Sequence, residues 1–238
     1  MRCVIMQPTF LPWAGYFRLM ALADQFVFLD DVQRVRQSWQ TRNRVLNRGQ
    51  IHWLIAPVEQ GALAQTIAAT QLVQGGPWRR KLGCLLRHGY GGHPFFSDLV
   101  ELVELIENGR EPRLAAYNIA LIEFCAARLG IATPRQLSST IAVDCEHRTQ
   151  RLIEMCRRVG CDTYLSPSGA AEYLAADGFT DRCDMTLEFF DESPPPYAQR
   201  GATEFVSHLS LVDLIANLGW SGTRAYVNGS WLPKELTK

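Results

Sequence analysis

Residues 3–32 read "CVIMQPTFLPWAGYFRLMALADQFVFLDDV", and this stretch decides the fold class. It begins with a short apolar run, places apolar side chains at helical spacing over 15–24, and returns over 25–32 to an apolar run that ends in two aspartates. Strand, helix and strand in this order indicate a βαβ unit, whose two strands are parallel. We therefore predict an α/β protein with a mainly parallel sheet flanked by helices, in a Rossmann-like three-layer arrangement.

The rest of the chain continues this alternation. Further strands are expected at 50–58, 135–143, 161–166 and 185–191. Further helices are expected as a pair within 75–109 separated by the loop 88–96, then at 112–131, 147–160, after 169, and at 210–219. The helical pair is a helical insertion in the α/β pattern, and the polar, arginine-rich segment 33–46 is assigned no regular structure. We expect one domain over 1–220 and a C-terminal tail over 221–238.

Composition limits the classes of function. The 238 residues include 24 basic and 24 acidic side chains, so the chain lacks the overall positive charge that non-specific nucleic-acid binding requires. The seven cysteines are scattered, odd in number and without a CxxC pair, which indicates a reducing cytoplasmic compartment. No stretch of about 18 uninterrupted apolar residues is present, so we expect neither a membrane span nor a signal peptide.

The segment between the first strand and the first helix is unusual because its twelve residues, 6–17, hold two prolines and four aromatic side chains. One interpretation is that the aromatic rings are core residues that close the end of the sheet. The other is that the segment forms the floor of a site. Gln7 would then offer an amide that both donates and accepts, and Tyr16 would stand at a helix start that favours anions.

Ligands of open parallel sheets bind beyond the carboxyl ends of the strands. Gln7 ends the first predicted strand, and Asp30 and Asp31 end the second, with Gln33 just after it. Adjacent side chains of a strand point to opposite sides, so one aspartate at most should face the crevice. That aspartate is a candidate catalytic base, and Gln33 is a candidate substrate-binding residue.

Arg42, Asn43 and Arg44 follow in the arginine-rich segment. Guanidinium groups bind phosphate or carboxylate in a bidentate manner, so we predict that these three residues bind substrate and that Asn43 shares a cavity with Gln7 and one aspartate. The alternative is a solvated basic face. In that case, truncating either arginine would have almost no effect.

Two further candidates lie in loops. His93, in the predicted loop 88–96, is a candidate catalytic base, although isolated loop histidines are often ordinary surface residues. Ser166, in "YLSPSG", follows a strand and is a candidate substrate-binding residue, but the G-x-S-x-G pattern of serine hydrolases is absent. No cysteine is expected to act as a nucleophile, and no ligand spacing indicates a metal site.

Six short motifs, in this order and spacing, resemble the WbqC-like protein family over Val4 to Trp220: "MQPTFLPWAGYF", "FLDDVQ", "SWQTRNRV", "YLSPSGAAEYL", "YAQ" and "HLSLVDLIANLGW". The resemblance implies a role in the assembly of surface polysaccharides or natural products, with acyl or aminoacyl transfer to an amino-sugar as the suspected reaction. It supplies no catalytic motif, and Met6 stands where many relatives have histidine. The first 32 residues are also similar to the start of HIGH-type nucleotidyltransferases, but the two histidines of that motif are missing.

The resulting hypothesis is a transferase that passes an acyl or aminoacyl group to the amine of a small molecule or nucleotide-linked sugar. We expect no bound cofactor; the donor would be an activated acyl group such as a thioester, and an acyl or peptidyl carrier protein is a potential partner. Two alternatives stay open: a non-catalytic binding or scaffold protein of a biosynthetic complex, and a divergent nucleotidyltransferase.

Overall fold

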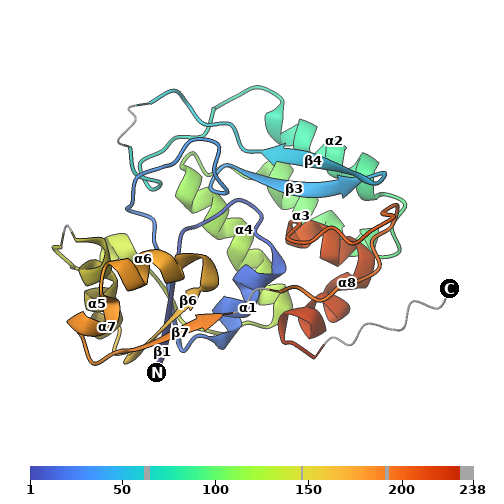
Figure 1. Ribbon diagram of the computed structural model, residues 1–238. Coiled ribbons are helices and arrows are strands. Elements are labelled where there is room, and N and C mark those ends of the chain that lie inside the picture. Colours follow the sequence, from blue (N-terminus) through green and yellow to red (C-terminus); the bar gives the residue numbers. More distant parts are fainter. Residues whose placement is uncertain (62–64, 146, 191–192, 231–238) are drawn as a thin grey trace.

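The computed structural model describes residues 1–61, 65–145, 147–190 and 193–230 (Figure 1). The strands are β1 (Arg2–Met6), β2 (Gln25–Phe28), β3 (Arg42–Asn47), β4 (Gln50–Ile55), β5 (Arg135–Leu137), β6 (Thr163–Pro167) and β7 (Thr186–Phe190). The α-helices are α1 (Ala14–Leu22), α2 (Trp78–Tyr90), α3 (Phe96–Asn108), α4 (Leu114–Leu129), α5 (Arg148–Arg158), α6 (Ala171–Ala176), α7 (Phe179–Arg182) and α8 (Leu211–Val227). Two short 3-10 helices, Ser138–Thr140 and Ser168–Ala170, follow β5 and β6.

Five strands form one parallel sheet in the order β5-β2-β1-β6-β7, which confirms the predicted α/β fold. When these five strands are numbered by their appearance in the chain, the order is that of the doubly wound nucleotide-binding folds. Their ligands bind where the strand order reverses, at the carboxyl ends of the two central strands. Here that point lies between β1 and β6.

The two faces of the sheet are covered by different helices. Val4 of β1 packs into a core with α1, α4 and α8, whereas its neighbours Cys3 and Ile5 pack into a second core with α5, Leu174 and Phe179. This alternation follows from the two-residue period of a strand. In Figure 1, α5, α6 and α7 accordingly lie on one side of the sheet and α1, α4 and α8 on the other.

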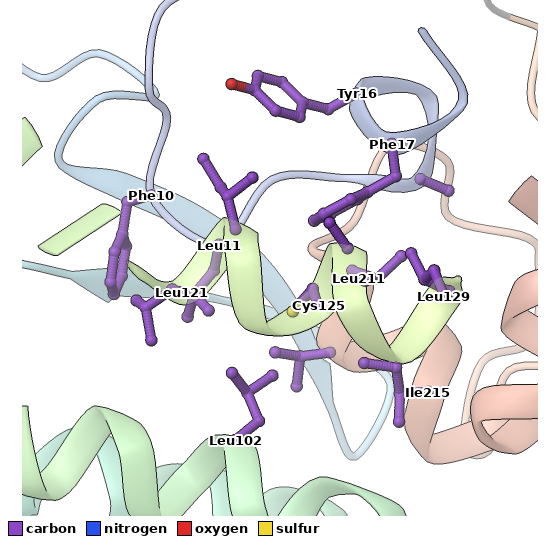
Figure 2. Packing of buried hydrophobic residues seen from close by; sticks show 14 of the residues in the cluster. Phe10, Leu11, Tyr16, Phe17, Leu102, Leu121, Cys125, Leu129, Leu211 and Ile215 are labelled. Carbon is purple, nitrogen blue, oxygen red and sulfur yellow. The ribbon is translucent and has the colours of Figure 1, made fainter. Parts of the chain in front are cut away.

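The aromatic segment after β1 is largely part of the core. Figure 2 shows Phe10, Leu11 and Phe17 gathered along α4, with Leu102 of α3 on the opposite side of that helix. Phe10 and Phe17 are fully buried, and Tyr16 is 1% exposed. The core interpretation is therefore right for these three rings, but Trp13 is only partly buried.

The expectation of no regular structure over 33–46 is wrong for its last part. Arg42–Asn47 forms β3, which pairs in antiparallel fashion with β4. The two strands are joined by Arg48 and Gly49, whose φ values are +52° and +75°. Two consecutive positive φ values define the type I′ turn that suits a tight hairpin.

The expected tail over 221–238 is wrong in its first part because α8 continues to Val227. Gly219 leaves the helical conformation, with φ 68° and ψ 175°, and the helix resumes after this kink. Residues 231–238 of the predicted tail lie outside the described residues, as do Asp191 at the end of one predicted strand and Glu192 after it.

Two other predicted boundaries shift. The strand expected over 135–143 ends at Leu137, and the loop expected over 88–96 is confined to Gly91–Phe95 because α2 reaches Tyr90 and α3 begins at Phe96. Among the described residues, no helix is both long and apolar enough to cross a membrane.

Candidate functional site

Gln7 and Tyr16 form part of one hydrogen-bonded corner at the end of β1. The Gln7 side-chain oxygen accepts a hydrogen bond of 2.9 Å from the Gln40 side chain. The buried Tyr16 hydroxyl donates to the backbone carbonyl of Gln7 over 3.2 Å. Burial raises the pKa of this phenol well above its ordinary value, so Tyr16 stays neutral. Their role in substrate binding stays a prediction, and both residues fix the turn that leaves β1.

The two aspartates after β2 bind the turn after β5. Asp30 is 3% exposed, and its carboxylate accepts hydrogen bonds from the Ser138 hydroxyl and from both the backbone N–H and the hydroxyl of Ser139. Asp31 accepts from Ser138 over 2.6 Å and pairs with Arg151 of α5 at 2.5 Å. These contacts hold the chain where β5 ends and the 3-10 helix Ser138–Thr140 begins. Catalysis by either aspartate stays a prediction.

The side chain of Asn43 binds the backbone of the aromatic segment and of β3. Its amide nitrogen donates to the carbonyls of Phe10 and Leu11, over 3.1 and 2.8 Å. Its side-chain oxygen accepts from the backbone N–H of Arg44 over 2.8 Å. Asn43 is 3% exposed, and these bonds hold the aromatic segment against β3. None of the cavities described below is lined by Asn43, Gln7 or either aspartate, and their predicted common cavity stays a prediction.

Arg42 and Arg44 lie on one face of the β3–β4 hairpin. The guanidinium carbon of Arg42 lies 4.3 Å from the centre of the Trp53 ring, and that of Arg44 lies 5.6 Å from the Trp39 ring. Arg44 also donates to the Ser207 carbonyl over 3.3 Å. Both arginines therefore stack on tryptophan, and neither lines the cavity described below.

The remaining candidates are dispersed. Gln33 is exposed and forms an isolated bridge with Thr66. Ser166 is fully buried at the end of β6, where its hydroxyl donates to the Pro167 carbonyl over 3.4 Å. His93 lies between α2 and α3, and its pKa is lowered, first by burial and then by the positive charge of Arg200.

A cavity of about 260 Å³ lies at the start of α1. Helix α1 begins after the carboxyl end of β1, and Phe190 at the carboxyl end of β7 forms part of the same wall. The cavity therefore lies toward the carboxyl ends of the strands, beside the exits of β1 and β7, whereas the strand order predicts a ligand between β1 and β6. Its walls come from the start of α1, the segment after β7 and the end of α8: Trp13, Ala14, Gly15, Arg18, Phe190, Ser193, Pro194, Pro195, Tyr226, Val227 and Gly229.

The positive charge of this cavity comes from Arg18 and from the helix start. Arg18 is the single charged residue of α1, and none of the ion pairs among the described residues includes it. Its guanidinium carbon lies 5.7 Å from the centre of the Phe190 ring. The N-terminal end of a helix carries partial positive charge and free backbone donors. An anionic group is therefore the ligand that this wall favours.

Trp13 covers the first turn of α1. A Cβ atom on Gly15 would overlap the Trp13 ring, so glycine is required where the ring lies. The Trp13 ring also lies against His208, with ring centres 4.5 Å apart. Trp13, His208 and Tyr197 line a second, smaller cavity that shares Trp13, Ala14, Pro194 and Tyr226 with the first.

A buried carboxylate lies behind this smaller cavity. Asp213 of α8 is fully buried and accepts hydrogen bonds from the hydroxyls of Tyr197 and Tyr90, over 2.7 and 2.9 Å. Gln199 and Asn217 donate to it over 3.4 and 3.3 Å. Burial raises the pKa of Asp213 despite these donors. The network joins α2, the segment after β7 and α8.

Sequence reasoning missed Arg18, Tyr197, His208 and Asp213. The signal for Arg18 was its isolation in an otherwise apolar helix, because a lone charge on such a helix needs a polar surrounding. The other three lie in "YAQ" and "HLSLVD", two of the motifs that carry the family resemblance. The segment that contains Trp13 is a third. One motif near the N-terminus and two motifs within 197–213 thus meet at the smaller cavity.

The fold and the site together define a Rossmann-like α/β protein with an anion-favouring cavity at the start of its first helix. The chain belongs to the WbqC-like protein family, whose model matches residues 7–225, and this confirms the resemblance drawn from the motifs. A relative from Mycobacterium tuberculosis (strain ATCC 25618 / H37Rv), named "Uncharacterized protein Rv1507c", is 28% identical over 221 residues, which are 92% of this chain and 94% of that protein. No solved structure matches the chain.

Proposed function

We propose that this protein binds a phosphate-bearing small molecule, such as a nucleotide-linked amino-sugar, in the cavity at the start of α1 and transfers an acyl or aminoacyl group to its amine. The reaction would serve surface-polysaccharide or natural-product assembly. The observation that carries the proposal is the meeting of Trp13, Tyr197 and His208, from three separate motifs, at the smaller cavity, which shares Trp13 with the larger cavity that contains Arg18.

The composition of the cavity suits such a substrate. Arg18 and the start of α1 bind the phosphate, and the rings of Trp13, Phe190 and Tyr226 provide apolar walls for a sugar or base. The volume, about 260 Å³, is slightly smaller than that of cavities that enclose drug-sized ligands. The cavity therefore holds the sugar phosphate, and the rest of the substrate extends toward solvent.

His208 is the proposed general base, in place of Asp30, Asp31 or His93. Its partly buried ring lies against Trp13 at an angle of 46° and lines the smaller cavity next to the α1 cavity. In the transfer step the substrate amine attacks the thioester carbonyl, the C–N bond forms and the C–S bond breaks. His208 takes the proton from the amine and returns it to the departing thiolate. The carrier of the thioester, a small thiol or a carrier protein, is part of the proposal.

The second candidate is a non-catalytic binding protein. It is favoured by the walls of the larger cavity, whose described residues include a guanidinium and a serine hydroxyl but no carboxylate, imidazole or thiol. Such a lining can hold an anion without transferring a proton. The divergent-nucleotidyltransferase alternative rests on the strand order and on the similarity of the first 32 residues to the start of HIGH-type nucleotidyltransferases.

A transfer assay separates the two candidates. The protein is incubated with a panel of nucleotide-linked amino-sugars and acyl or aminoacyl thioesters, and the products are measured by mass spectrometry. The transferase proposal expects an amide product with wild type. His208→Asn should lower kcat by about 100-fold or more, with little change in substrate affinity. Phosphate-dependent binding without product in any combination would favour the binding protein.

A further inference from the structure

The outer face of the β3–β4 hairpin is an exposed apolar patch. Nine large hydrophobic residues are exposed in the described structure, and five of them belong to this region. Their exposed fractions are Val35 56%, Trp39 47%, Ile51 45%, Trp53 40% and Ile55 52%. We call these five residues the hairpin patch. Scattered apolar side chains are ordinary on a surface, but a contiguous group marks an interaction site.

The pairing of β3 with β4 and the contact between the Trp39 and Trp53 rings bring four of the five residues together. Ile51, Trp53 and Ile55 alternate along β4 and therefore point to one face. Arg44 is the cross-strand partner of Trp53, and Arg42 is the partner of Ile55. The opposite face, which carries Val45 and Leu54, packs into the main core. The hairpin thus buries one apolar face in this protein and leaves a second one without cover among the described residues.

The charge around the patch has one sign. Residues 32–58 contain five arginines, at 34, 36, 42, 44 and 48, and no acidic residue. Since the whole chain has zero net charge, this stretch carries +5 and the remaining residues carry −5. None of the ion pairs among the described residues includes any of the five arginines.

We propose that the hairpin patch is a docking surface for a partner protein that presents an acidic amphipathic helix. Tryptophan and arginine are the residues that protein interfaces favour at their energetic centres. The apolar stripe of the helix would lie over Ile51, Trp53 and Ile55, and acidic side chains on both flanks would meet the arginines. This surface is separate from the α1 cavity, so it adds a partner to the proposed function and does not depend on it.

Two other occupants fit the patch less well. A second copy of this chain would bring two patches of +5 together, which like-charge repulsion opposes. Single-stranded nucleic acid binds through open aromatic faces on which bases stack. Here the Trp39 and Trp53 rings face each other with centres 5.7 Å apart, and each also has an arginine over it. The exposed isoleucines and valine suit apolar side chains of a protein instead.

The test is an NMR titration of the ¹⁵N-labelled protein with a synthetic helical peptide of about 18 residues that carries a leucine stripe at i, i+3, i+4 and i+7 and glutamate elsewhere. We expect shifts confined to the hairpin patch and its arginines, and an affinity that falls steeply as salt rises. Arg42→Glu and Trp53→Ser should each weaken binding about 10-fold or more. The matched controls, Arg80→Glu on α2 and Phe189→Ser on β7, should leave it unchanged.

Probe controls define the result that would overturn the proposal. A peptide with lysine in place of glutamate, and one with serine in place of leucine, should fail to shift the patch. The docking surface is refuted if about 1 mM of the acidic peptide shifts no hairpin signal, since even weak complexes are populated there. The proposal is also refuted if the lysine peptide or an oligothymidylate binds as tightly as the acidic peptide or more tightly. A dimer of this protein in analytical ultracentrifugation that Arg42→Glu abolishes would likewise refute it.

Discussion

Asp30 illustrates how a side chain can be placed correctly from sequence while its contacts are not. Its position after β2 follows from the strand pattern. Its carboxylate, however, accepts hydrogen bonds from Ser138 and Ser139, which lie more than a hundred residues later in the chain. Nothing in the local sequence predicts this pairing. The same holds for Asn43, whose amide is used by the backbone of Phe10 and Leu11.

Asp30→Ala should lower the free energy of unfolding by about 1.5–3 kcal/mol, the usual scale for hydrogen bonds to a charged group, because the Ser139 N–H and hydroxyl lose their carboxylate acceptor while Ser138 keeps Asp31. Chemical denaturation measures this loss. Asp144→Ala, at an exposed position, is the control and should cost less than about 0.5 kcal/mol. If Asp30→Ala is as stable as wild type but fails in the transfer assay, Asp30 belongs to the chemistry and our structural interpretation is wrong.

His93 should titrate below the ordinary histidine pKa of about 6.5, because burial and Arg200 both oppose its charged form. The unfolded chain then takes up a proton before the native protein does. The free energy of unfolding should therefore fall as the pH drops below about 6.5, down to the native pKa.

NMR titration of the His93 ring checks this directly. Arg200→Gln should raise its pKa because the cation is removed, and His93→Gln should flatten the dependence of stability on pH in that window. A His93 pKa at or above 6.5 in the native protein would contradict the expected sign.

At the scale of elements, the start of α1 depends on close contact between Trp13 and Gly15. Gly15→Ala should displace the Trp13 ring, cost about 1–3 kcal/mol of stability and shift tryptophan fluorescence. Gly169→Ala is the matched control, because a Cβ atom there would meet nothing within 4 Å. Equal effects of the two substitutions would show that Trp13 is not held over this helix turn.

Element boundaries were predictable where one local signal dominated. The βαβ unit follows from residues 3–32 because both strands are buried and the helix spacing is regular. The hairpin was missed since β3 alternates arginine with buried residues, a pattern that reads as polar. The predicted helix at 210–219 stops too early because glycine commonly ends helices. Gly219, with a φ of 68°, only kinks α8.

At the scale of the whole molecule, the fold class and the ligand edge follow from the sequence, but the cavity does not. The cavity forms only where Trp13, Phe190 and Tyr226 meet. Trp13 precedes α1, Phe190 ends β7 and Tyr226 lies near the end of α8. These three residues meet because of the strand order and because α8 packs against α1. The motifs indicated which residues matter without indicating that they converge.

The central claim is that Arg18 and the start of α1 bind the phosphate of a substrate. Calorimetric titration with a nucleotide-linked amino-sugar, and with the same sugar lacking phosphate, tests it most directly. Arg18→Gln should weaken binding of the phosphorylated ligand by about 1.5–3 kcal/mol, or roughly 10-fold to 150-fold, and should leave the weak binding of the bare sugar unchanged. Arg80→Gln, at an exposed position of α2, should behave as wild type. Equal affinity of wild type and Arg18→Gln for the phosphorylated ligand would contradict the account.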